Sequence, residues 1–206
     1  MRDPYLDTNE QFDVLVSLRE AIHQLERVQC DPHCWKWVVN ALISAANGAM
    51  VCNLSGSMGI GALKEEAQKK MIKALDVAMR TQGVVSDLPN SFLETPGMLF
   101  GNLKNQRRVE PGSGPSHKLS DEVEKDFKWL IGVRNNFTHF QPQGWSIHIP
   151  SIAATGLSTL SIVEAVAKDG HSLRHLNEID YGEVIKSCEE IATMLERVLT
   201  SFRAKD

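Results

Sequence analysis

Three polar side chains in the second half of the chain have types and spacing that could do chemistry. Arg134, Asn135 and His139 lie within the strongly apolar stretch 127–140. Arginine is a fixed cation that binds phosphate oxygens, and histidine titrates near neutral pH and can act as a general acid or base. On a helix Asn135 and His139 share a face, and a long arginine side chain can reach the same region. Unpaired polar groups are costly to bury. The pattern therefore predicts either that these side chains line a cleft that contains a site, or that they are buried and hydrogen-bonded to other groups in the core.

The stretch that carries these residues is predicted to be a helix over about 121–140. Its large apolar residues would cover most of the helix circumference, which predicts a helix buried on nearly every side. Ser120 or Asp121 suits the N-cap, and Pro142 places the end of the helix near Phe140. The apolar positions are 127, 129, 130, 131, 133, 137 and 140.

The run from Arg134 through Asn135 to His139 resembles the Arg-x4-His motif of the HEPN superfamily (higher eukaryotes and prokaryotes nucleotide-binding). The following Phe-Thr-His-Phe-Gln-Pro-x-Gly-Trp run is similar to that of uncharacterised bacterial relatives, and the resemblance covers about residues 120–150. It implies an all-α bundle in which two protomers bring their motifs together as a metal-independent ribonuclease site. His139 would then be the general base or acid, Arg134 would hold the scissile phosphate, and Asn135 would orient the phosphate or the imidazole.

The resemblance implies a metal-independent endoribonuclease that cleaves RNA by 2′-OH attack, in a toxin–antitoxin, phage-defence or RNA-processing setting, with no cofactor. We expect a homodimer, supported by small residues in 33–53 that would let another helix approach closely, and an antitoxin or nucleotidyltransferase as a further partner. The alternative is a non-catalytic HEPN-like interaction or nucleotide-binding module. In that case the same residues would tie helices or protomers together.

The rest of the chain is predicted to be helical, with apolar residues spaced three and four apart. The expected long helices span 9–28, 33–53, 62–81, 121–140, 150–168 and 180–203, with a short helix over 97–106. We expect an all-α, HEPN-like bundle of about five long helices plus one short helix, forming a single domain over residues 1–206. The glycine-rich run 55–61 follows a helix and lacks the Gly-Lys-Ser/Thr ending of a phosphate-binding loop, so it is predicted to be an ordinary loop.

Proline, glycine and serine over 111–116 predict a flexible loop across about 107–118, just before the helix with the motif. Four basic residues flank this loop and could steer RNA phosphates towards Arg134. An exposed charged loop without that function is the alternative. The four residues are Lys104, Arg107, Arg108 and Lys118.

Composition limits the remaining classes of protein. The 206 residues are 42% hydrophobic and 23% charged with a net charge of −4, so no overall basic surface of an avid nucleic-acid binder is present. The four cysteines suggest no disulfide framework, and no apolar run is long enough to span a membrane, which predicts a cytoplasmic protein. Cys30, His33 and Cys34 lack a second ligand pair, so no metal site is expected.

Overall fold

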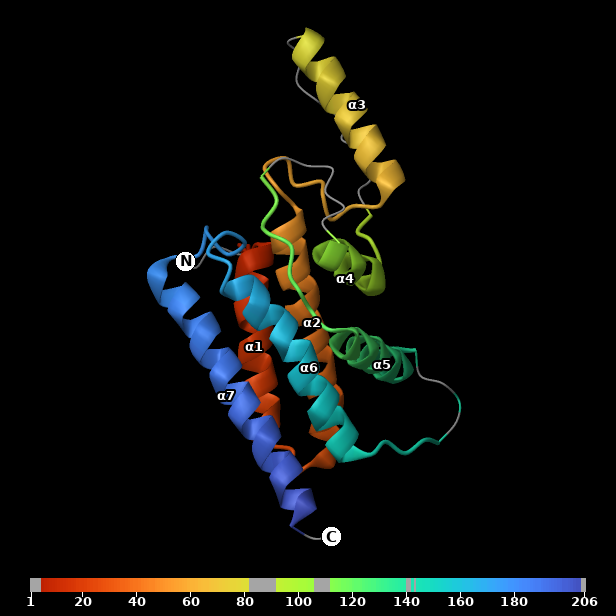
Figure 1. The fold of residues 1–206 in the computed structure, drawn as a ribbon, viewed down its shortest axis with the longest axis vertical. Helices are drawn as coiled ribbons and strands as arrows, with labels where there is room; N and C mark the ends of the chain where they lie inside the picture. The colour runs from red at the N-terminus through yellow and green to blue at the C-terminus, as the bar shows by residue number, and fades with distance from the viewer. Residues whose placement is uncertain (1–4, 82–91, 106–111, 140–141, 143, 205–206) are drawn as a thin grey trace.

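The computed structural model describes residues 5–81, 92–105, 112–139, 142 and 144–204. This part of the chain contains seven α-helices, one 3-10 helix and no β-strand, which confirms the all-α fold class (Figure 1). Six of the α-helices have 16 or more residues, one for each of the six long segments predicted and one more than the predicted count of about five. The elements are α1 (Glu10–Leu25), η1 (Pro32–Cys34), α2 (Trp35–Leu54), α3 (Glu65–Thr81), α4 (Pro96–Asn105), α5 (Asp121–Thr138), α6 (Ile149–Ala167) and α7 (Glu178–Arg203).

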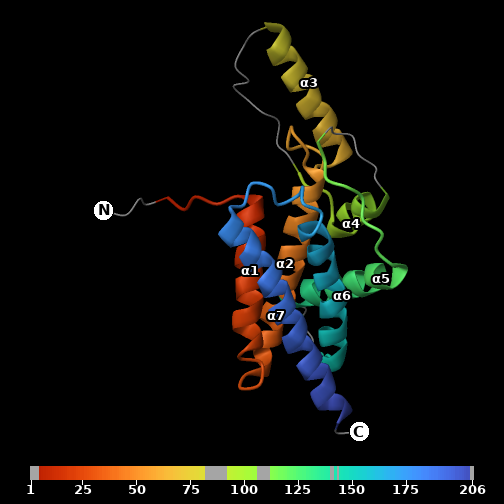
Figure 2. The same cartoon turned by 60° about the vertical axis from the view of Figure 1, so that its left-hand side comes forward.

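Four of these helices, α1, α2, α6 and α7, run side by side as an elongated bundle (Figures 1 and 2). The short helix α4 and the longer α5 lie against one flank, where α5 packs on α6 and α2. Helix α3 extends away from the end of the bundle at which α2 finishes. The run 55–61 between α2 and α3 is a loop, as predicted, with Gly56 and Gly59 at positive φ.

Helix α2 lies at the centre of the core because its small residues allow close packing. Ala45 and Ala49 are fully buried, and a Cβ added to Gly48 would lie 2.9 Å from Val14 Cγ2 on α1. The small residues of α2 are therefore used for packing within the chain. This packing uses the small residues without a second copy, so the expected homodimer stays a prediction.

Helix α5 has one buried face. Phe127 and Leu130 are fully buried and Val133 is 6% exposed, but Trp129 is 40% exposed. The prediction of a helix buried on nearly every side is wrong, because α5 lies on the flank of the bundle and its contacts with α2, α4 and α6 leave its outer face in solvent.

We expect Phe127→Ala and Leu130→Ala each to lower the free energy of unfolding by about 2–5 kcal/mol, through lost apolar burial and the cavity left behind. Chemical denaturation of the purified variants would measure this. Trp129→Ala, on the exposed face of the same helix, is the matched control and should change stability by about 0.5 kcal/mol or less. Equal effects at the three positions would show that α5 is not anchored through its Phe127–Leu130 face.

Two helical segments, 32–54 and 149–167, are apolar and long enough to cross a membrane by length and composition alone. Within the bundle, 67% and 50% of the two segments are buried. Core helices of soluble proteins pass the same test, so the two segments are compatible with a soluble protein. All four cysteines are free thiols.

Candidate functional site

The motif residues lie at the C-terminal end of α5, where local hydrogen bonds end the helix. The Thr138 hydroxyl donates to the carbonyl oxygens of Arg134 and Asn135 at 3.0 and 3.2 Å, and the His139 N–H donates to Asn135 O at 2.9 Å. Such bonds satisfy carbonyls that a helix end leaves without partners. His139 is the C-cap residue, with φ −95° and ψ 3°, so the helix ends one residue before it.

The three side chains share this helix end but differ in exposure. Arg134 and Asn135 are half-buried, whereas His139 is exposed. Within the described residues no hydrogen bond joins their side chains. The Nε atom of Arg134 is buried and finds no hydrogen-bond partner in the same part of the chain. A buried charged donor without a partner is unfavourable, so Arg134 Nε would be stabilised by an acceptor such as an anion oxygen.

An aromatic pair adjoins the same end of α5. Phe137, one helical turn after Arg134, packs its ring against Trp145, with the ring centroids 4.7 Å apart and the planes tilted by 55°. Trp145 belongs to the irregular segment 144–148 that leads into α6, and it is 39% exposed. The helix end therefore carries an aromatic pair and, three residues before Phe137, a cationic side chain, which are groups suited to nucleotide recognition.

Acidic residues are confined to the N-terminal part of α5 and are absent from its C-terminal end. The acidic residues of α5 lie in its first two turns, and no Asp or Glu occurs between Asp126 and Glu164. The same stretch contains Lys128 and Arg134. Lys128 is paired with Glu124 at 2.7 Å, whereas an anion can approach Arg134 without meeting a carboxylate of the same segment.

The residues predicted to bind RNA are placed elsewhere or lie outside the described residues. Lys104 pairs with Asp121 and with Glu124, and hydrogen bonding to Asp121 raises the pKa of the lysine. Because Asp121 starts α5, Lys104 is about 20 Å along the helix from Arg134 at 1.5 Å per residue. Lys118 is exposed. Arg107 and Arg108 lie outside the described residues.

The described part of the predicted flexible loop, 112–118, is hydrogen-bonded to the bundle. The Ser113 hydroxyl donates to Leu54 O at 3.0 Å, and the Gly114 N–H donates to Asn53 O at 2.8 Å. His171 Nε2 lies 2.7 Å from Gly112 O and 3.0 Å from Arg174 Nη1. The segment is therefore fixed to the end of α2 and to the connection between α6 and α7.

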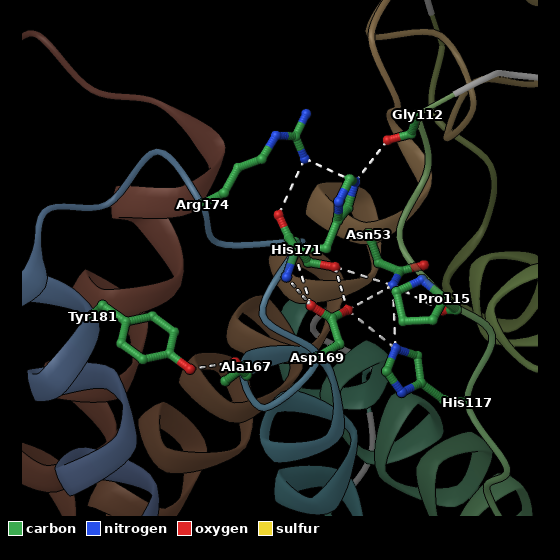
Figure 3. Close-up of polar contacts among 10 residues, drawn as sticks. Asn53, Gly112, Pro115, His117, Ala167, Asp169, His171, Arg174 and Tyr181 are labelled. Atoms are coloured by element: carbon green, nitrogen blue, oxygen red, sulfur yellow. Dashed lines mark hydrogen bonds and ion pairs between the residues drawn. The ribbon is translucent and has the colours of Figure 1, made fainter.

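A second group of polar residues, which sequence reasoning missed, lies beneath this segment (Figure 3). We define the Asp169 cluster as Asn53, His117, Asp169 and Ser172. The fully buried Asn53 directs its Nδ2 atom to Pro115 O at 3.1 Å and to Asp169 Oδ2 at 3.0 Å. His117 Nε2 lies 3.3 Å from the same carboxylate oxygen, and the Ser172 hydroxyl donates to it at 2.5 Å.

The carboxylate at the centre of the cluster is held in its ionised form. Its side chain is 2% exposed, and this burial opposes ionisation. Hydrogen bonds from His117, from the Ser172 hydroxyl and from the N–H groups of Ser172 and His171 outweigh the burial, and they hold the pKa of Asp169 well below its usual range. Asp169 therefore contributes stability as an anion.

The Ser-His-Asp composition of the Asp169 cluster does not make it a hydrolase site. Ser172 is fully buried and donates its hydroxyl to Asp169. A nucleophilic serine needs a base that accepts its proton and a path by which substrate reaches it. Within the described residues Ser172 has neither such a base nor such a path. The cluster instead joins α2, the segment 112–118 and the α6–α7 connection. In the sequence, only the Asp169-Gly170 turn signals it.

No group of three His, Cys, Asp or Glu residues that could hold a metal ion occurs in the described part of the chain. Comparison with known proteins gives no relative: no family model, no curated protein and no solved structure matches this chain.

Proposed function

We propose that this protein is a metal-independent endoribonuclease of HEPN type, with its site at the C-terminal end of α5. The observation that carries the proposal is the buried Nε atom of Arg134, which has no hydrogen-bond partner within the described residues. Arg134 precedes the exposed His139 by five residues at the same helix end, in a segment of the sequence without acidic residues. A guanidinium with an unused Nε donor and an imidazole at one helix end suit a phosphodiester that must be bound and then cleaved.

In the proposed reaction the ribose 2′-oxygen attacks the adjacent phosphorus and the bond from phosphorus to the 5′-oxygen breaks. The products are a 2′,3′-cyclic phosphate and a 5′-hydroxyl. His139 either removes the proton of the 2′-hydroxyl as base or protonates the departing 5′-oxygen as acid. Arg134 holds the phosphate and stabilises the charge that develops on it, and Asn135 orients the phosphate or the imidazole by hydrogen bonding.

A single helix end supplies one histidine, whereas this reaction needs both a base and an acid. A second copy of the chain would supply the second histidine, so we propose a homodimer with the two α5 C-termini close to the twofold axis. The outer face of α5, with Trp129 40% exposed, is available for such contact. The proposed setting is cytoplasmic toxin–antitoxin, phage-defence or RNA-processing activity, with an antitoxin or nucleotidyltransferase as a further partner.

The alternative proposal is a non-catalytic HEPN-like module that binds a nucleotide or a protein partner. One observation favours it: no hydrogen bond orients the His139 ring within the described residues, and a catalytic histidine is usually oriented by a third group. In this alternative Arg134 would still bind an anion, but no bond would be cleaved.

The experiment that separates the two is an RNA cleavage assay on the purified protein in the presence of EDTA. We expect cleavage of single-stranded RNA to continue with chelator present and to leave 2′,3′-cyclic phosphate ends, which mass spectrometry distinguishes from 3′-phosphates. RNA in which every 2′-hydroxyl is methylated is the matched substrate control and should stay intact. Cleavage of the methylated RNA would contradict the 2′-OH mechanism, and absence of any cleavage of unmodified RNA would favour the alternative.

A further inference from the structure

We propose that Trp145 is a stacking platform for an unpaired nucleobase, and that the site therefore takes single-stranded rather than duplex RNA. The inference rests on the proposed function in taking RNA as the ligand, and it adds a binding residue outside the motif. It assigns Trp145 to the base and Arg134 to the adjoining phosphate.

The geometry of the aromatic pair carries this inference. Phe137 packs against Trp145 with a centroid distance of 4.7 Å, so the indole is held on one side by a residue of α5. Trp145 is nevertheless 39% exposed, which leaves part of the indole open to solvent. An aromatic ring that is fixed before binding loses little conformational entropy when a base stacks on it.

Position along α5 connects this platform to the cation. Phe137 is three residues after Arg134, so the two side chains lie on neighbouring positions of one helix face. A nucleotide whose phosphate is bound by Arg134 would therefore have Phe137 and Trp145 within reach of its base. Bases inside a duplex are stacked on one another and cannot offer a free face, so the arrangement selects unpaired nucleotides.

The absence of acidic residues between Asp126 and Glu164 supports a ligand with a phosphate backbone. Stacking alone would also suit an uncharged aromatic ligand or an apolar partner. The unpaired Nε donor of Arg134 and the lack of carboxylates in this segment of the sequence favour an anionic one. A partly exposed tryptophan, an unpaired Nε donor and a segment free of carboxylates together suit single-stranded nucleic acid.

The test measures binding without cleavage, by fluorescence anisotropy with a labelled 2′-O-methyl RNA of about ten nucleotides. The methyl groups block 2′-OH attack, so binding is measured whether or not the protein is a nuclease. The same sequence annealed to its complement is the duplex arm. The protein variants are Trp145→Ala, Trp145→Phe and, as a control, Phe92→Ala, which removes an aromatic side chain that is 63% exposed near the start of α3.

We expect the single strand to bind the wild type more tightly than the duplex does, and Trp145→Ala to weaken that binding about tenfold or more. Trp145→Phe should keep most of the affinity, and Phe92→Ala should leave it unchanged. Unchanged affinity in Trp145→Ala, equal binding of the duplex, or no binding to the wild type would each overturn the inference. If Trp145-dependent binding is found but unmodified RNA is never cleaved, the platform stands and the nuclease proposal fails.

Discussion

Replacing His139 or Arg134 by alanine is expected to reduce RNA cleavage by about 10²–10⁴-fold while leaving the fold nearly unchanged. The lower part of this range is typical of removing one charge-stabilising donor, and the whole range is typical of removing a general acid or base. His139 is exposed at the end of α5, so its removal should change stability by about 0.5 kcal/mol or less. Cleavage rates in EDTA and thermal melting of each variant are the paired measurements.

Removal of Arg134 is the more informative half of this experiment. Its Nε atom is buried without a partner in the described part of the chain, so truncation deletes an unfavourable buried donor and is expected to leave stability unchanged or slightly higher. Arg134→Lys keeps the charge but loses the planar set of donors, and we expect it to recover only a small part of the activity. Asn136→Ala, which alters an exposed neighbour outside the proposed site, is the matched control.

A structural role for the same residues makes the opposite prediction. The three side chains could instead tie helices or protomers together. Truncating one of them would then leave its buried hydrogen-bond partners unpaired and lower the free energy of unfolding by about 1–3 kcal/mol. Variants that melt early, from a wild type that cleaves no RNA, would rule out the enzyme and support the interaction module. Retained cleavage in both alanine variants would place any nuclease site elsewhere in the protein.

The helices were predictable because the signals that define them are local. Ser120 lies where the sequence predicts an N-cap, and its hydroxyl accepts a hydrogen bond from the Val123 N–H at 3.3 Å. The exposure of α5 was not predictable, because its apolar residues do not reveal how many neighbours the helix has. Trp129 and Leu130 are both large and apolar, yet Leu130 is fully buried and Trp129 is 40% exposed.

The candidate site was predictable in part for the same reason. Arg134 and His139 are close in sequence, so their shared helix end follows from the spacing alone. The position of Lys104 beside Asp121 and Glu124 depends on how α4 meets α5, which no local pattern gives. The Asp169 cluster was missed because Asn53 lies 116 residues before Asp169, and only the fold brings the two together.

The Asp169 cluster gives the largest expected effect on stability. We expect Asp169→Ala to lower the free energy of unfolding at pH 7 by about 3–5 kcal/mol, because several buried donors lose their acceptor at once. These donors come from Asn53, Ser172 and the backbone of His171. Asp31→Ala is the matched control, since Asp31 also accepts a backbone N–H two residues on, from His33 at 2.9 Å, but in an exposed turn. That variant should cost about 0.5–1 kcal/mol.

The dependence of this effect on pH distinguishes a buried anion from simple loss of packing. The pKa of Asp169 is lowered by folding, so its carboxylate contributes fully above the pKa of an unfolded aspartate, about 3.9, and the contribution declines as the pH falls towards the lower folded-state pKa. The wild type should therefore lose stability relative to Asp169→Ala below about pH 4. Urea unfolding of both proteins between pH 7 and pH 3 measures this difference. A constant difference across that range would show that the Asp169 carboxylate is not the stabilising group, whereas a difference that shrinks only in acid identifies the buried charge as the feature that holds α2, the segment 112–118 and the α6–α7 connection together.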